Sequence, residues 1–185
     1  IFKSLLFQII FTLYAIDVIF PGFKHNDLHT DNIMLKFDVH TPMNDPRYLQ
    51  YRISGNKRDV VYNLPYFNLI PKLIDFGFSI MPSEGIISDI VEDRTMMFHR
   101  TGSTDSLTLF HWIYHTVAIS NRDNIAKINA MLSALEPSEC YISSNYAREA
   151  RRVKLNSYEK MLKSDIFREY KMRNIPDEMI LHKYE

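Results

Sequence analysis

The sequence predicts an α+β fold that is mainly helical and contains a small β-hairpin region. Residues 5–20, 103–117 and 121–135 are apolar or amphipathic stretches with the length and spacing of helices. Residues 48–53 and 60–64 alternate around a turn signal and are rich in β-branched and aromatic side chains. With 185 residues, of which 46% are apolar, the chain is long enough to form one domain with its own core.

The charge balance argues against one broad class of function. The chain carries 22 basic and 22 acidic side chains, so its formal net charge is zero. A protein that grips nucleic acid through a basic field needs an excess of Lys and Arg, so we expect no nucleic-acid partner. The single cysteine, Cys140, rules out an internal disulfide framework and a Cys-rich zinc site, which is typical of an intracellular protein.

The first apolar stretch, Leu5–Phe20, resembles a membrane span or a signal peptide in composition. It contains Gln8 and Asp17, and it ends at Pro21 and Gly22. A membrane span needs about 18–20 uninterrupted apolar residues, and no small-residue cleavage site follows this stretch. We therefore predict the buried central helix of a globular domain, and membrane association is not expected.

Two motifs carry candidate chemistry. After the turn the sequence is KHNDLHTDNIML over residues 24–35, and further on it is LIDFG over residues 73–77. The spacing from Asp27 to Asn32 lets one loop present a carboxylate and an amide to the same side. Carboxylate and amide oxygens suit Mg²⁺, and a carboxylate beside a hydroxyl accepts its proton. Without the second motif, Asp27 and Asn32 would indicate an Asx-type turn after a helix.

Together and in this order, the motifs resemble the catalytic half of a protein kinase: helix, HxDLxxxN loop, strand, second strand and DFG. The form HNDLHTDNIM resembles the protein kinases of nucleocytoplasmic large DNA viruses, and haspin-like kinases have a similar hairpin between the two motifs. The resemblance covers roughly residues 1–118. It implies a kinase-like large lobe over residues 1–144, with a catalytic loop at 23–35, a hairpin insertion at 45–70 and an Asp-Phe-Gly turn at 75–77. Residues 145–185 are expected to form a helical extension of the same lobe.

The resemblance also implies the roles of individual residues in phosphoryl transfer from ATP. Catalysis of this reaction depends mostly on positioning the reactants and on stabilising the charge that develops on the phosphoryl oxygens. The implied residues are Asp27 as the base, Asn32 and Asp75 as Mg²⁺ ligands, and Met34, Ile74 and His29 as contacts of ATP.

The catalytic loop departs from the usual kinase pattern at two positions. Asn26 stands where most kinases have an Arg that binds a phosphorylated activation loop. An amide cannot form that bidentate pair, so we predict no control by phosphorylation at Ser83, Ser88 or Thr95. His29 replaces a Lys, and it either approaches the γ-phosphate or packs against the loop and caps it. The acidic residues of the segment after the second motif are expected to lie in a solvated loop, and the alternative is that they bind a basic peptide substrate. They are Glu84, Asp89, Glu92 and Asp93.

The helix predicted after residue 103 carries polar residues that need interpretation. Asp105 stands where kinases place a buried Asp that braces the catalytic loop, and it fits a helix N-cap equally well. His111 and His115 lie four residues apart and therefore on one face. A zinc site needs three or four ligands and no third is evident, so we expect ordinary packing of both rings.

A kinase also needs a small lobe with a Gly-rich loop, a strand Lys and a helix Glu. None of the five glycines falls in a GxGxxG pattern, so we expect the small lobe to be a partner missing from this sequence. We predict the catalytic-lobe fragment of a Ser/Thr protein kinase that uses ATP and Mg²⁺, acts on a protein substrate and is inactive without its small lobe. The alternatives are a non-catalytic kinase-like binding module and a small-molecule phosphotransferase of the choline- or aminoglycoside-kinase type. An intracellular location is expected, in the host cytoplasm or the virion if the protein is viral.

Overall fold

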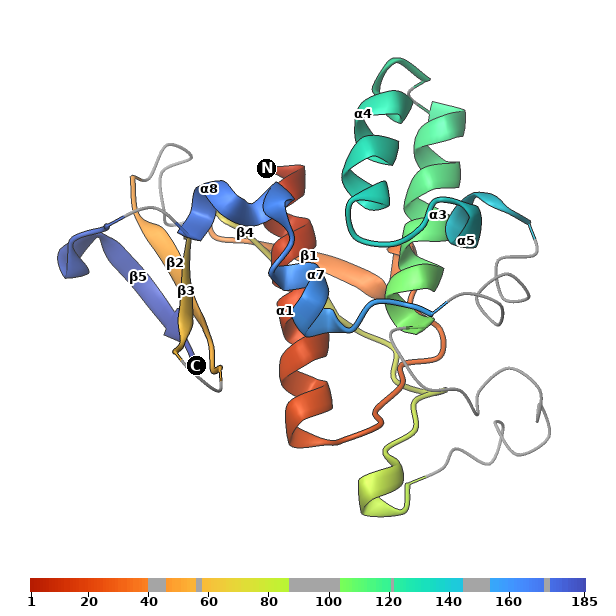
Figure 1. The fold of residues 1–185 in the computed structure, drawn as a ribbon, viewed down its shortest axis with the longest axis horizontal. Helices are drawn as coiled ribbons and strands as arrows, with labels where there is room; N and C mark the ends of the chain where they lie inside the picture. Colours follow the sequence, from red (N-terminus) through yellow and green to blue (C-terminus); the bar gives the residue numbers. More distant parts are fainter. Residues whose placement is uncertain (40–45, 56–57, 87–103, 121, 145–153, 172–173) are drawn as a thin grey trace.

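Helix α1 (Phe2–Ile19) runs through the middle of the computed structural model, with the other elements on either side of it (Figure 1). The structure describes residues 1–39, 46–55, 58–86, 104–120, 122–144, 154–171 and 174–185. The remaining helices are α3 (Thr104–Ser120), α4 (Arg122–Ser133), α5 (Glu139–Ile142), α7 (Tyr158–Leu162) and α8 (Arg168–Lys171). The strands are β1 (Ile33–Phe37), β2 (Tyr48–Ile53), β3 (Val60–Pro65), β4 (Leu69–Leu73) and β5 (Ile180–Tyr184). Short 3-10 helices are η1 (Thr30–Asn32), η2 (Pro82–Glu84), η3 (Asp165–Phe167) and η4 (Asp177–Met179).

Helix α1 is the core helix that the sequence predicts. Among the described helices it is the one long and apolar enough to cross a membrane, a criterion that a core helix also meets. Its Phe7 ring is fully buried and lies 4.8 Å from the ring of Tyr62 and 5.0 Å from that of Phe167. The helix packs against α7 and β4. Its buried residues are Ser4, Leu6, Phe7, Gln8, Ile9, Ile10, Phe11 and Leu13.

The strands form two small sheets. Strands β1 and β4 pair antiparallel, with Ile33 opposite Leu73, so the chain leaves one motif and enters the other at the same end of this sheet. Strands β2 and β3 form the predicted antiparallel hairpin, with Tyr51 opposite Tyr62. The hairpin's turn includes residues 56–57, which lie outside the described residues.

The C-terminal segment departs from the predicted helical extension. It is helical over α7 and α8, but it ends in β5, which pairs parallel with β2 and gives the sheet order β3-β2-β5. The rings of Tyr51 and Tyr184 stack at 4.6 Å with an angle of 9° between their planes. Aromatic and branched side chains that pack against a neighbouring strand favour strand over helix here. The N-terminal part of this extension, residues 145–153, lies outside the described residues.

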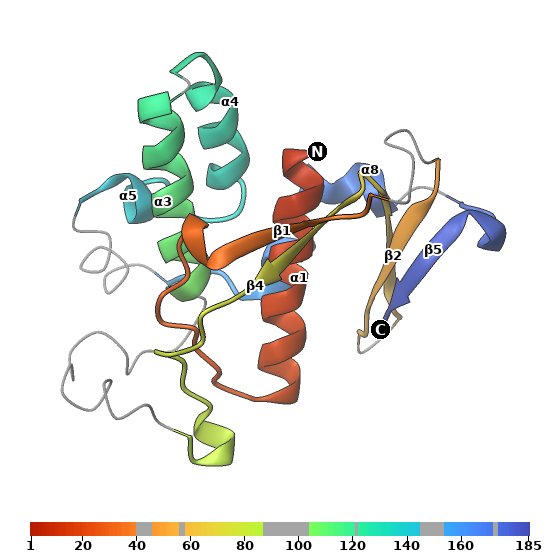
Figure 2. The same ribbon diagram turned by 180° about the vertical axis from the view of Figure 1, so that it is seen from behind.

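Helices α3, α4 and α5 pack together on the opposite side of α1 from the hairpin and β5, as both views show (Figures 1 and 2). The predicted helices at 103–117 and 121–135 are confirmed as α3 and α4. The fold is therefore a mixture of several helices and small sheets, which agrees with the α+β class.

Candidate active site

The loop between α1 and β1 carries the first motif, and a tight turn starts it. Gly22 has φ 84°, a left-handed conformation that glycine adopts without strain, and its N–H donates to Oδ1 of Asp17 at 3.1 Å. Leu28 is fully buried and anchors the middle of the loop in the core. The loop is thus tied to the end of α1 and to the core, and the residues on either side of Leu28 are held at the surface.

Asp27 and Asn32 lie side by side in this loop. Nδ2 of Asn32 donates to the main-chain O of Asp27 at 2.8 Å and to Oδ2 of Asp27 at 3.2 Å. The Asn32 side chain is buried, whereas that of Asp27 is 38% exposed. Because the amide N–H₂ is committed to Asp27, Oδ1 of Asn32 is the atom that remains to bind a cation.

His29 is held inside the same loop. Its Nδ1 accepts the N–H of Asp31 at 3.3 Å, which caps η1. Its Nε2 lies 3.2 Å from Nδ2 of Asn32 and 3.7 Å from Oδ2 of Asp27. The ring also faces Trp112 at 5.6 Å. The capping role, one of the two predicted alternatives, is therefore present in the structure.

Asp75 follows β4 on a segment that is bonded to the loop through the backbone. The N–H of Ile74 donates to the main-chain O of Asn32 at 3.0 Å, which places the second motif directly beside the first. Asp75 itself is exposed and has φ 59°, and its Oδ1 accepts a long bond from the N–H of Gly77 at 3.4 Å. Asp and Asn tolerate this left-handed conformation better than most residues.

The residues that meet here fit a magnesium site in chemical type. Asn32 and Asp75 offer an amide oxygen and a carboxylate from adjacent segments, and hard cations such as Mg²⁺ prefer oxygen ligands. Among the described residues there is no cluster of three His, Cys, Asp or Glu side chains that would hold a transition metal. His111 and His115 donate to the main-chain O of Tyr141 at 2.8 Å and of Ile142 at 3.1 Å, contacts that the packing interpretation expects.

Asp105 braces the loop from helix α3. Its Oδ2 accepts the N–H of His25 at 2.8 Å and its Oδ1 accepts the N–H of Asn26 at 3.0 Å. The side chain is only 2% exposed, and this burial raises the pKa of the Asp105 carboxyl, against the effect of the two N–H bonds and of nearby Lys24. Of the two predicted alternatives, these contacts match the brace, because both carboxylate oxygens accept N–H groups of the loop between α1 and β1.

Of the predicted ATP contacts, Ile74 lies between the two motifs, whereas Met34 lies on the exposed strand β1. Ile74 lies between the two motifs and is bonded to the backbone of Asn32. Met34 lies on β1, where it is 54% exposed beside Leu35 and Phe37, both 48% exposed. Met34 therefore belongs to a strand whose large apolar side chains are accessible, and we call Met34, Leu35 and Phe37 the β1 apolar residues.

Sequence reasoning missed the side chains that fix the segment after the second motif. Nδ2 of Asn26 donates to the main-chain O of Phe78 at 2.9 Å, and Lys24 pairs with Ile80 through two backbone bonds. Lys24 is buried, which lowers the pKa of its ammonium group, while Asp105 acts in the opposite direction. The signal available in the sequence is that Asn is favoured at left-handed positions, and Asn26 has φ 65°.

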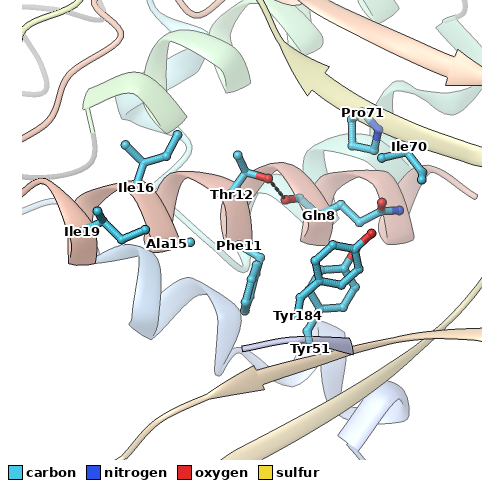
Figure 3. Close-up of a pocket in the computed structure, with 10 residues that line it drawn as sticks. All are labelled: Gln8, Phe11, Thr12, Ala15, Ile16, Ile19, Tyr51, Ile70, Pro71 and Tyr184. Atoms are coloured by element: carbon cyan, nitrogen blue, oxygen red, sulfur yellow. Dashed lines mark hydrogen bonds between the residues drawn. The ribbon is translucent and has the colours of Figure 1, made fainter. Parts of the chain in front are cut away.

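A separate pocket of about 220 Å³ lies between α1, β2, β4 and β5 (Figure 3). It is mainly apolar and shares no residue with the loop of the first motif or the Asp-Phe-Gly turn, so it is not part of the candidate active site. Its lining residues include Gln8, Phe11, Thr12, Ile70, Tyr51 and Tyr184.

Of the predicted acidic cluster, Glu84 lies in η2, and Asp89, Glu92 and Asp93 lie outside the described residues.

Comparisons with known proteins agree with the motifs at a coarse level. No protein-family model matches the chain. The chain is 28% identical over 141 residues to "Putative serine/threonine-protein kinase R301" of Acanthamoeba polyphaga mimivirus, a match that covers 71% of this chain and 34% of that protein. It is 25% identical over 119 residues to "Putative serine/threonine-protein kinase R400" of the same virus, covering 63% of this chain and 24% of that protein. The chain thus spans between a quarter and about a third of these relatives' length, and the similarity suggests a kinase-like chain and nothing more specific.

Proposed function

We propose that this chain carries the catalytic and metal-binding loops of a Ser/Thr protein kinase. The observation that supports this best is that Asn32 is bonded both to Asp27, through its side chain, and to Ile74, the neighbour of Asp75, through its backbone. A candidate base and two candidate metal ligands from sequence positions far apart thus meet at one end of the β1–β4 sheet.

In this proposal each side chain has a defined task. Bound Mg-ATP supplies the phosphoryl group that is transferred. Asp27 orients the accepting Ser or Thr hydroxyl and takes its proton, because its carboxylate is partly exposed and fixed by Asn32. Asn32 and Asp75 bind Mg²⁺ through oxygen atoms, and His29 holds the loop in shape. Met34 and Ile74 offer apolar surface to the nucleotide.

A complete kinase nucleotide site needs a small lobe with a Gly-rich loop, and none of the five glycines of this sequence falls in a GxGxxG pattern. The β1 apolar residues Met34, Leu35 and Phe37 are accessible, and a small lobe and an adenine ring would cover apolar side chains of this kind. We therefore propose that the chain works with a small lobe as its partner and transfers no phosphate alone. Because both relatives are viral proteins, we also propose a viral protein that acts inside the host cell or is packaged in the virion.

The test uses the protein with all the sequence that flanks this chain in its reading frame. We expect transfer of the γ-phosphate from Mg-ATP to Ser or Thr in a protein substrate such as casein. Asp27→Asn keeps the size of the side chain but removes the base, so the rate should fall by about 100-fold or more. Asp31→Asn is the matched control, since Asp31 lies in the same loop with a side chain that is 90% exposed, and its rate should change by less than about threefold.

Three results would contradict the proposal. Asp27→Asn with the rate of the unchanged protein would remove Asp27 from the role of base. Nucleotide binding without transfer to any acceptor would indicate a kinase-like binding module. Transfer to choline or an aminoglycoside, and not to protein, would indicate a small-molecule phosphotransferase.

A further inference from the structure

The catalytic loop holds the Asp-Phe-Gly turn, residues 75–77, from both sides. Before the turn, Nε2–H of His25 donates to the main-chain O of Ile74 at 3.0 Å. After the turn, Nδ2–H of Asn26 donates to the main-chain O of Phe78 at 2.9 Å. Two adjacent residues of one loop therefore bind the residues that directly precede and directly follow the turn.

Asn26 has a backbone that fixes where its side chain starts. Its φ of 65° is left-handed, a conformation in which Asn is several-fold enriched over other non-glycine residues. Its N–H donates to Oδ1 of Asp105, and Asp105 is almost fully buried in helix α3. The amide of Asn26 therefore extends toward Phe78 from a position that is itself held by the core.

The bond from Asn26 to Phe78 is one of several hydrogen bonds that join residues 24–26 to residues 78–80. Oγ of Ser79 donates to the main-chain O of His25 at 3.3 Å. Ile80 and Lys24 exchange two backbone bonds of 2.9 and 3.1 Å. Ser79 and Ile80 are both 8% exposed, so this short pairing is shielded from water. Figure 2 shows the segment after β4 descending beside the loop between α1 and β1.

Asp75 depends on these flanking contacts for its position. Among the described residues, no hydrogen bond joins its carboxylate to another element, since its bond from Gly77 lies within the turn. The bonds from the His25 and Asn26 side chains to the backbone on either side of residues 75–77 therefore determine where the candidate metal ligand lies.

We infer that Asn26 is a positioning residue, whose neutral amide fixes the Asp-Phe-Gly turn on the catalytic loop without a phosphate group. This inference rests on the proposed function, because it concerns the placement of a Mg²⁺ ligand. A bond between a neutral amide and a carbonyl needs no charge on either partner. Phosphorylation of the protein is thus not required to hold the turn in place.

The first experiment measures the Mg²⁺ concentration that gives half-maximal phosphate transfer. Asn26→Asp keeps the size of the side chain but cannot donate to a carbonyl, and Asn26→Gly removes the amide while keeping the left-handed backbone free of strain. Both should raise the half-saturating Mg²⁺ concentration by about five- to tenfold, the factor expected for one neutral hydrogen bond. Ser79→Ala removes a longer bond between the same two segments, and it should change this concentration by less than about twofold. A residue that only supported the fold would lower the maximal rate and leave the Mg²⁺ dependence unchanged.

The second experiment measures amide hydrogen exchange and does not need activity. In Asn26→Asp the amides of Ser79 and Ile80 should exchange about tenfold faster, while those of the β2–β3 hairpin should stay unchanged. Unchanged exchange at Ser79 and Ile80, or faster exchange with an unchanged Mg²⁺ dependence, would overturn the inference. A large loss of activity after phosphatase treatment of the unsubstituted protein would overturn its phosphate-independence. If the unsubstituted protein transfers no phosphate at all, the proposed function fails, and hydrogen exchange alone decides whether Asn26 anchors the turn.

Discussion

Replacing Asp105 by Ala should cost much more stability than replacing the exposed Asp31 of the loop that Asp105 contacts. The carboxylate of Asp105 accepts two backbone N–H groups, from His25 at 2.8 Å and from Asn26 at 3.0 Å. Ala offers no acceptor, so the buried N–H of His25 and the partly buried N–H of Asn26 would both lose their partner. Lys24, which is buried nearby and interacts electrostatically with Asp105, would also lose an opposite charge.

The magnitude follows from the number of bonds. Leaving one buried donor unsatisfied costs about 1–3 kcal/mol, so two donors give about 2–6 kcal/mol. Part of this is offset, because burial raises the pKa of the Asp105 carboxyl and its removal relieves the cost of burying a charge. We therefore expect Asp105→Ala to lower the free energy of unfolding by about 3 kcal/mol, out of about 5–15 kcal/mol for a typical domain.

Urea denaturation followed by tryptophan fluorescence measures this loss. Trp112 is the single tryptophan of the chain, and its ring lies 5.6 Å from that of His29, so it reports on the loop between α1 and β1. For a slope of about 2 kcal/mol per M, the urea midpoint should fall by about 1.5 M. Asp31→Ala, with a side chain that is 90% exposed, should change the free energy of unfolding by less than about 0.5 kcal/mol. A midpoint for Asp105→Ala within about 0.3 M of the unsubstituted protein would refute the conclusion that Asp105 holds the loop.

Two further predictions concern other buried or partly buried polar groups. Gln8 lines the pocket of Figure 3, is 5% exposed, and has no hydrogen-bond partner for its Oε1 among the described residues. Gln8→Met should therefore raise the free energy of unfolding, measured in urea, by about 1 kcal/mol. A lower free energy of unfolding would contradict this prediction. Burial lowers the pKa of His111 below its usual 6.5, so the unfolded chain binds a proton first as the pH falls, and stability decreases below about pH 6.5. His111→Gln should make the decrease between pH 7.5 and 5.5 shallower, and an unchanged difference between the urea midpoints at these two pH values would exclude this contribution.

Local patterns in the sequence were sufficient to predict the main elements of the fold. The apolar run that became α1, the amphipathic spacing of α3 and the alternation of β2 and β3 each report a structure formed by neighbouring residues. Strand β5 was missed because its stability comes from β2, which lies more than a hundred residues earlier in the chain. Tyr48 pairs with Ile180, and no property of either segment alone reveals that contact.

In the candidate site, too, features set by neighbouring residues were predicted and contacts between distant residues were not. Asp27, Asn32 and Asp75 were predicted because their chemistry and spacing are written in two short motifs. The contact from Asn26 to Phe78 was not predicted, since it joins residues 52 positions apart and depends on the left-handed backbone of Asn26. For Asp105 the sequence left two roles open, and only the distances to His25 and Asn26 decide between them.

The two candidate metal ligands are held to different degrees, and this difference bears on how a cation would bind. Asn32 is buried and its amide is bonded to both the backbone and the side chain of Asp27. Asp75 is exposed, and among the described residues the loop donates side-chain hydrogen bonds to the backbone of Ile74 before the turn and of Phe78 after it. Mg²⁺ demands a near-octahedral arrangement of oxygen atoms and keeps several waters. With Asn32 fixed and the side chain of Asp75 free to change rotamer, the two candidate ligands can meet that demand without moving the core. This requires the turn that carries Asp75 to stay bound to the loop between α1 and β1. The bonds from His25 and Asn26 satisfy this condition, so we expect them to affect the proposed metal binding although neither residue is a candidate ligand.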